Sequence, residues 1–149
     1  MRKASVRGVY SLLYPNIPTN IILHVSPASS SEKPLHWVGS SKKGLLAFPE
    51  EVIDDIGYAL GVVQLGGTPP SAKSWKVEGS GVLEIVKGFR GDAYRVVYTV
   101  RFTEAVYVLH RFQKKSPSGI STARSDTRLI HERLKVAQVD YEVRYGNKA

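Results

Sequence analysis

The sequence predicts a small α+β fold, in which an N-terminal strand and helices pack on a small antiparallel sheet and a C-terminal helix follows. Two observations lead to this class. Residues 81–117 have the pattern of three consecutive strands joined by short turns, a meander. Apolar residues at helical spacing precede and follow this stretch. The predicted order is therefore strand, helix, three strands and helix.

The first 33 residues differ in composition from the rest. Their apolar patches are broken by Pro15 and Pro18, and a Ser-rich stretch follows at 26–31. A signal peptide needs an unbroken apolar run of about 7–15 residues, and a membrane span needs about 20. We therefore expect residues 1–33 to be a poorly ordered extension of a folded domain at 34–149, in a cytoplasmic protein without membrane contact.

Helical signals follow a strand candidate at 35–38. A brief helix is expected over 42–47. Pro49 suits the first position of a longer helix, and the acidic residues after it lie near the positive end of the helix dipole. Apolar residues recur at helical spacing until Gly66-Gly67, which ends this helix.

The strand at 94–102 alternates most clearly. Its even positions are aromatic or apolar, whereas Arg95 and Arg101 are among its odd positions. This period of two predicts one buried face and leaves Arg95 on the opposite side. The next strand, 105–112, is apolar on both faces, which is typical of an interior strand.

A last helix is expected from Ser121 or Thr122 to about Tyr145, because apolar residues again recur at helical spacing after a Ser-Gly turn. This helix would pack its apolar side on the sheet and complete the domain. The predicted apolar side consists of Leu129, Ile130, Leu134, Ala137 and Tyr141.

Composition limits the chemistry. The chain has 149 residues, 42% hydrophobic and 23% charged, as expected for one globular domain. It has no cysteine, and its four histidines lack the spacing of a zinc motif, so we expect no metal and no cofactor. The net charge of +8 favours a polyanionic partner such as RNA, DNA or an acidic protein. A merely basic soluble protein is the alternative.

Four short motifs follow one another over about a hundred residues. They are SKKGLLAFP at Ser41–Pro49, GVLEI at Gly81–Ile85, YRVVY at Tyr94–Tyr98 and LHRFQKKS at Leu109–Ser116. In this order they resemble the RelE/ParE toxin superfamily, and most closely its phage-type HigB-like branch. The resemblance covers about 34–141 and implies a RelE-like fold. It also implies a toxin of a bacterial toxin–antitoxin pair, with an antitoxin carrying a helix-turn-helix as partner.

The resemblance also implies an activity. Many relatives cleave mRNA in the ribosomal A site without a metal, through attack of the ribose 2′-hydroxyl on the adjacent phosphate. A ribosome-dependent endoribonuclease, or mRNA interferase, is therefore the leading expectation. The ParE branch instead inhibits DNA gyrase without cleavage, and a degenerate relative would only bind its partner or nucleic acid. Both alternatives stay open.

Site residues follow from the motifs. Arg95 matches the arginine that contacts the scissile phosphate, and Lys115 stands at the position of a second cation. His110 is the best candidate acid or base, since a histidine exchanges protons near neutral pH. Lys114 beside Lys115 suits phosphate contact. Catalytic roles are thus expected for Arg95, His110 and Lys115.

The lysines that RelE-type relatives carry on the first strand of the meander are missing. Glu84 stands at one of their positions and is a candidate acid or base, and Lys87 lies close by. Lys76, in the loop before this strand, and Lys87 are candidate phosphate contacts. Phe112 would stack on a base.

Each assignment has a structural alternative. Arg95 would pair with Glu84 across the hairpin. His110, expected on the face of Val106 and Val108, would be a hydrogen-bonded core histidine. Phe112 would belong to the core, and the lysines would be a solvated strand end.

Overall fold

The computed structural model describes residues 32–114 and 124–146. The predicted extension therefore falls almost entirely outside the described residues. Near the start of the described residues, Lys33 forms two hydrogen bonds with Gln64 at the end of a helix. The Lys33 N–H donates to the Gln64 carbonyl oxygen, and the Gln64 side-chain amide donates to the Lys33 carbonyl oxygen, both over 2.9 Å. Lys33 thus already makes long-range contacts with the folded domain.

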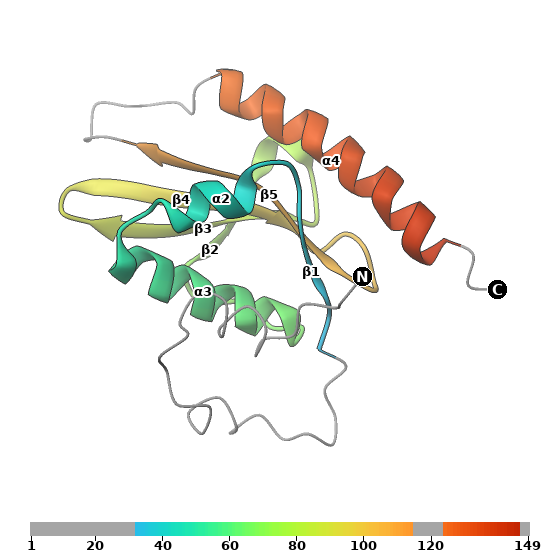
Figure 1. Ribbon diagram of the computed structural model, residues 1–149, viewed down its shortest axis with the longest axis horizontal. Coiled ribbons are helices and arrows are strands. Elements are labelled where there is room, and N and C mark those ends of the chain that lie inside the picture. The colour runs from blue at the N-terminus through green and yellow to red at the C-terminus, as the bar shows by residue number, and fades with distance from the viewer. Residues whose placement is uncertain (1–31, 115–123, 147–149) are drawn as a thin grey trace.

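Five strands form one mixed sheet, with helices on both faces (Figure 1). This arrangement confirms the α+β class and the C-terminal helix. The elements in chain order are β1 (Leu35–Trp37), α2 (Ser41–Leu46), α3 (Glu50–Gln64), β2 (Ala72–Ser74), the 3-10 turn η2 (Lys76–Glu78), β3 (Val82–Phe89), β4 (Asp92–Thr99), β5 (Val106–Lys114) and α4 (Arg124–Tyr145).

The sheet order is β1-β5-β4-β3-β2. Strands β2, β3, β4 and β5 pair antiparallel, whereas β1 lies parallel to β5. The prediction of an antiparallel sheet is therefore wrong for its first strand, β1. The chain leaves β1 through two helices and returns to its side only at β5, which is a crossover connection and yields a parallel pair. As predicted, β5 is interior, between β1 and β4.

Strand β2 was not expected, because its stretch contains the Pro, Gly and Ser residues of a connection. Its three residues pair with β3 and form the far edge of the sheet. The backbone N–H of Trp75 then donates to the Val82 carbonyl oxygen over 2.9 Å, which extends this pairing by one residue. A short edge strand leaves too little periodicity to be recognised in the sequence.

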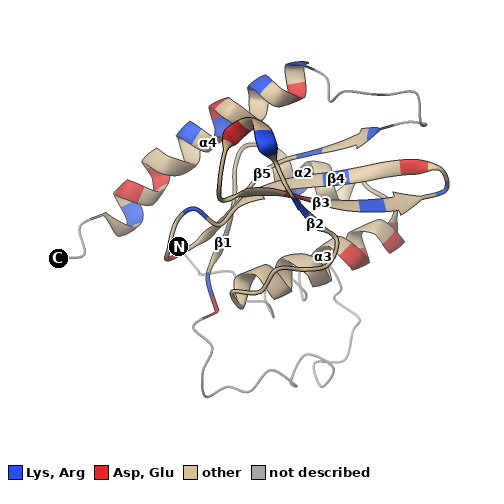
Figure 2. Cartoon of the chain, turned by 180° about the vertical axis from the view of Figure 1, so that it is seen from behind, with Lys and Arg blue, Asp and Glu red and all other residues tan. Residues whose placement is uncertain are grey.

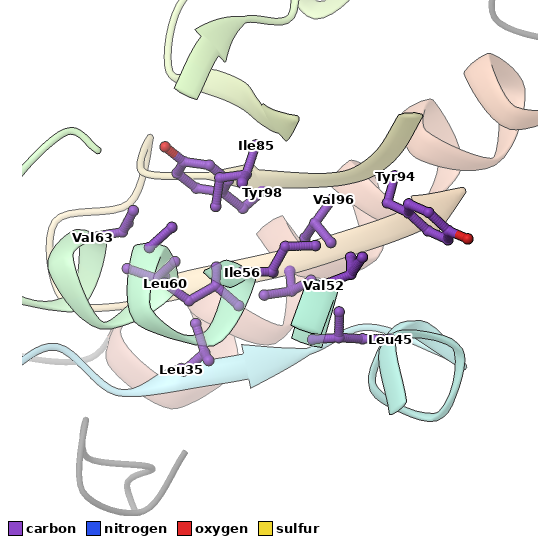
Figure 3. Close-up of a cluster of buried hydrophobic side chains, with 13 residues drawn as sticks. Leu35, Leu45, Val52, Ile56, Leu60, Val63, Ile85, Tyr94, Val96 and Tyr98 are labelled. Carbon is purple, nitrogen blue, oxygen red and sulfur yellow. The ribbon is translucent and has the colours of Figure 1, made fainter. Parts of the chain in front are cut away.

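Helices α2 and α3 cover one face of the sheet. Pro49 stands at the N-cap position of α3, one residue before the first helical position that the sequence predicts for it. Glu50 and Glu51 occupy the first turn, as the sequence predicts. The buried stripe of this helix packs on alternate residues of β3, β4 and β5 (Figure 3). The largest contributors include Val52, Ile56, Leu60, Val63, Ile85, Val96 and Tyr98.

Helix α4 covers the other face with a second core. Ile130, Leu134 and Ala137 are buried there, and Tyr141 packs against the same cluster. The predicted apolar side of the last helix is confirmed at these positions. The expected N-cap, Ser121 or Thr122, lies outside the described residues.

Because α4 lies on the sheet, β4 is buried on both faces, not on one. Val97 and Thr99, at odd positions, are as inaccessible to solvent as the even-numbered Val96. The strand also ends at Thr99, so Phe102 leaves the expected row and joins the core under α4. Alternation described the local chain correctly but could not show what covers its second face.

A β-bulge in β5 changes which side chains face α4. Val97 pairs with His110, yet its neighbour Tyr98 pairs with Val108, so Leu109 is an extra residue on β5. An extra residue shifts the alternation by one position. His110 therefore lies on the α4 face, not on the face of Val108 where the unbroken pattern placed it.

Candidate functional site

Cross-strand register brings five predicted site residues to the α4 face. Residues directly opposite in an antiparallel pair share a face. Glu84 on β3 and His110 on β5 pair with the same residue of β4, and Arg95 pairs with Phe112. Lys114 follows Phe112 by two positions and thus lies on the same face. Three neighbouring strands therefore present an acid, a guanidinium and an imidazole side by side.

Arg95 and Glu84 form an ion pair. The Arg95 Nη1 donates to the Glu84 Oε1 over 2.7 Å, and the two side chains are only 21% and 10% exposed. The structural alternative for Arg95, an ion pair with Glu84 across the hairpin, is thus present in the molecule. The pair is nevertheless incomplete, because Glu84 Oε2 and Arg95 Nε are buried with no hydrogen-bond partner among the described residues.

His110 is buried, with partners at both ring nitrogens. Its Nε2 lies 2.8 Å from the Asp126 Oδ1, and its Nδ1 lies 3.3 Å from the Arg133 Nη1. Because a guanidinium can only donate, Nδ1 accepts, and the ring proton is therefore on Nε2 and directed at Asp126. Burial lowers the pKa of His110, although the hydrogen bond with Asp126 opposes this shift.

Arg133 links α4 to β5 and to the turn before α2. Its Nη1 donates to the Leu109 carbonyl oxygen over 2.9 Å, and its Nη2 donates to the Ser40 hydroxyl over 3.1 Å. Burial and the nearby Arg111 lower the pKa of Arg133. These contacts hold α4 against the bulged part of β5, so they fix the position of His110.

Aromatic rings close the site on one side. Phe112 is buried, stacks on His110 with ring centroids 5.8 Å apart, and meets Trp75 edge-on at 6.2 Å. Trp75 is itself only 6% exposed. In the described structure Phe112 therefore belongs to the core, as its structural alternative states.

The predicted cations lie in different places. Lys76 is exposed on η2, next to Trp75, and Lys114 is half-buried at the end of β5. Lys115 lies outside the described residues. Lys87 faces the other side of the sheet, where its ammonium forms an ion pair with Asp55 on α3, and this hydrogen bond raises the pKa of Lys87. The structure therefore does not bring Lys87 together with Arg95 and Lys114.

Several polar residues of this face were not predicted from the sequence. Lys73 on β2 is in register with Glu84, so a further cation lies on the same row. Glu78 accepts from His131 Nδ1 at 3.1 Å and connects η2 to α4. Asp126 lies in the first turn of α4, where the sequence indicates only a favourable charge for the helix dipole. Tertiary packing alone gives these residues their place at the site.

Figure 2 shows Lys and Arg positions on β3, β4, β5 and α4, with acidic positions interspersed among them, and further acidic positions near the start of α3. Among the described residues, no group of three or more His, Cys, Asp or Glu side chains could hold a metal ion. None of the described helices is both long and apolar enough to cross a membrane.

These features define a small α+β protein with a polar, partly basic site between a sheet and its C-terminal helix. The sequence profile of phage-derived Gp49-like proteins matches residues 43–135, more than half of the 149-residue chain. The chain belongs to this Gp49-like family, which is a RelE/ParE-like toxin family. The superfamily inferred from the motifs is thus confirmed. No curated protein and no solved structure matches the chain.

Proposed function

We propose that this chain is the toxin of a type II toxin–antitoxin pair, with a RelE-like fold and a HigB-like, ribosome-dependent mRNA endonuclease activity that needs no metal. The observation that carries the proposal is that Glu84, Arg95 and His110 lie on three adjacent strands and on the same face of the sheet. A carboxylate, a guanidinium and an imidazole are the groups that transfer protons and stabilise charge in metal-independent RNA cleavage.

Glu84 is the proposed base. One of its oxygens holds Arg95, and the other, Oε2, is buried without a partner among the described residues. This free oxygen accepts the proton of the ribose 2′-hydroxyl as the hydroxyl oxygen attacks the adjacent phosphorus. The new O–P bond forms a 2′,3′-cyclic phosphate while the bond to the 5′-oxygen breaks.

Arg95 supplies positive charge to the phosphorane. Its guanidinium is oriented by Glu84, and fixed donors stabilise developing charge better than mobile ones. Lys114 lies on the same face and, with Lys115 and Lys76, contacts the flanking phosphates. Such contacts fix the RNA backbone in register with the catalytic groups.

His110 is the proposed proton donor to the leaving 5′-oxygen. It keeps its Nε2–H on Asp126, and the substrate replaces Arg133 at Nδ1, the longer of its two contacts. Protonated on Nδ1, the imidazolium donates to the departing oxygen while the Asp126 carboxylate stabilises its charge. Burial disfavours this charged form, and the phosphate anion offsets that effect.

The spacing suits in-line displacement. Glu84 and His110 are separated by one strand, so their backbones lie about 10 Å apart at the usual strand spacing. Base and acid can therefore stand on opposite sides of one phosphate, with each within hydrogen-bonding reach of its oxygen. In the cytoplasm, an antitoxin with a helix-turn-helix would cover this basic face, and the ribosome would present the mRNA to it.

The test is induced expression of the full chain in a bacterial host, with mapping of mRNA 5′ ends. We expect new cuts within translated messages. Arg95→Lys, which keeps the charge and the pair with Glu84, should reduce cutting about 10–100-fold because the planar fork is lost. Soluble, folded variant protein must be verified by thermal unfolding.

Two outcomes contradict the proposal. Growth arrest with trapped gyrase–DNA complexes and intact mRNA would establish the gyrase inhibitor instead. Folded protein that causes neither arrest nor cuts would leave a protein that only binds its partner or nucleic acid. Lys87→Ala serves as the matched control, because Lys87 is a cation of the opposite face paired with Asp55.

A further inference from the structure

Trp75 carries a buried polar group that the proposed chemistry does not yet use. Its indole Nε1 is inaccessible to solvent and has no hydrogen-bond partner among the described residues. Buried donors are nearly always paired, and an unpaired one loses its hydration without compensation. Such a donor on the same face as Glu84 and Arg95 requires an explanation.

The ring of Trp75 reaches across the sheet toward this pair. Trp75 follows β2, whereas Phe112 is on β5, and strands three places apart lie about 14 Å from each other. The two ring centroids are nevertheless only 6.2 Å apart. The side chains therefore meet above β3 and β4, over the face that carries Glu84 and Arg95.

Three unpartnered polar atoms thus belong to side chains of this one face: the donors Trp75 Nε1 and Arg95 Nε, and the acceptor Glu84 Oε2. Two donors and one acceptor complement a ribose phosphodiester, whose non-bridging oxygens accept and whose 2′-hydroxyl donates. Glu84 is already assigned to the hydroxyl. The two N–H donors therefore suit the phosphate anion.

We propose that Trp75 is a further substrate-contact residue, which donates its indole N–H to a non-bridging oxygen of the RNA phosphate held by Arg95. The inference rests on the proposed function and extends its site to the segment before β3. Because the indole nitrogen is covered, the ring of Trp75 or Phe112 moves to admit the phosphate. The same indole then stabilises negative charge on the phosphorane.

Binding is tested without cleavage. The chain has two tryptophans, and their indole N–H signals are separate probes in an ¹⁵N-labelled protein. Trp75→Phe assigns its signal by loss. A single-stranded 2′-deoxyoligonucleotide, which lacks the attacking hydroxyl, should shift the Trp75 indole signal saturably. The signal of Trp37, which packs against the core of the opposite face, should stay in place.

Catalysis is the second readout. Trp75→Phe keeps an aromatic ring against Phe112 and removes only the N–H. Loss of one such donor should lower kcat on ribosome-bound mRNA about 100-fold with little change in KM. A phosphorothioate at the scissile non-bridging position should slow the wild type but add little to the defect of Trp75→Phe, an interaction that a purely structural residue would not show.

The outcomes separate the two proposals. If the Trp75 indole signal does not shift when the oligonucleotide is added, this inference is overturned, whether or not the protein cleaves RNA. A signal that moves with Glu84→Gln but not with the oligonucleotide makes the indole a partner of Glu84 and also overturns it. A shift in a protein that never cleaves mRNA supports the phosphate contact and rejects the nuclease.

Discussion

At the scale of single residues, the proposed phosphate-binding role of Arg95 opposes its structural role. Its ion pair with Glu84 is mostly buried, so each charge depends on the other for stability. A substrate phosphate would compete with Glu84 for the same guanidinium. Loss of activity after a change at Arg95 therefore has two physical causes, and stability must be measured beside activity.

Arg95→Ala should destabilise the fold by about 2–4 kcal/mol, because it leaves the Glu84 carboxylate buried without its cation. Replacing both residues with leucine should recover most of this loss, since no buried charge remains. Urea unfolding of the single and double variants measures both values. Equal stability of Arg95→Ala and wild type would show that the pair is weak in solution.

Two histidines make the folded state sensitive to acid. Burial lowers the pKa of His36, which contacts the Tyr145 hydroxyl at 2.8 Å, with the nearby Arg144 as a further cause. Burial lowers the pKa of His110 in the same way. Below pH 6.5 the unfolded chain therefore binds more protons than the folded one, and stability falls as pH decreases toward the folded-state pKa values.

We expect unfolding free energy to decrease between pH 7.5 and pH 5.5. His110→Gln should remove part of this slope, and His36→Gln with His110→Gln should remove more. Asp140, although partly buried, has a lowered pKa because Tyr107 and Arg144 donate to it. Its contribution to stability is therefore present above its unfolded-state pKa of about 4 and is lost only as pH falls below that value toward the lower folded-state pKa. A slope unchanged in the double variant would exclude both histidines as its source.

At the scale of elements, helix α4 packs on the sheet through only a few of its side chains. Its buried row is narrow, and Val136, Val139 and Val143 are more than half exposed on the outer side. The packing of Ile130, Leu134 and Ala137 and the contacts of Arg133, rather than helix propensity, therefore hold the helix over the site.

Ile130→Ala should cost about 2–4 kcal/mol, because this side chain is fully buried and its removal leaves a cavity. Val143→Ala is the matched control on the same helix: its side chain is 77% exposed, so the change should stay within about 0.5 kcal/mol. Chemical denaturation of both variants compares the two costs. Similar losses would mean that the outer face is covered in solution.

At the scale of the whole molecule, the sheet separates charges that the sequence presents together. Lys87 is neutralised by Asp55 on the α3 face, whereas Lys114 shares a face with Arg95. The net charge of +8 therefore does not show by itself which face of the sheet would attract a polyanion.

Single-stranded RNA binding should therefore depend on one lysine and not on the other. Lys114→Ala should weaken binding and reduce the slope of log affinity against log salt by about 0.7, the value for one contact with a single strand. Lys87→Ala should leave the slope unchanged. Affinities for a uridine homopolymer over a series of salt concentrations measure both. Equal effects of the two substitutions on the salt slope would mean that the RNA contacts both faces of the sheet or neither.

Local periodicity was enough to predict the order of most elements. The helix after Pro49, the strands around Tyr94 and Val106 and the buried row of α4 all follow from spacing that each segment carries by itself. The family was also recognisable from the sequence, because its short motifs follow one another in order along the chain, and these motifs supply the candidate site residues Glu84, Arg95 and His110.

What the sequence by itself determined is therefore the class of fold and the family, since both depend on patterns of neighbours along the chain. Only the tertiary structure decided that β1 runs parallel to β5, that Arg95 pairs with Glu84 and that Lys87 faces away. It also decided, through one extra residue in β5, that His110 meets α4. These features depend on strand register and on contacts between distant segments, and no local pattern specifies either.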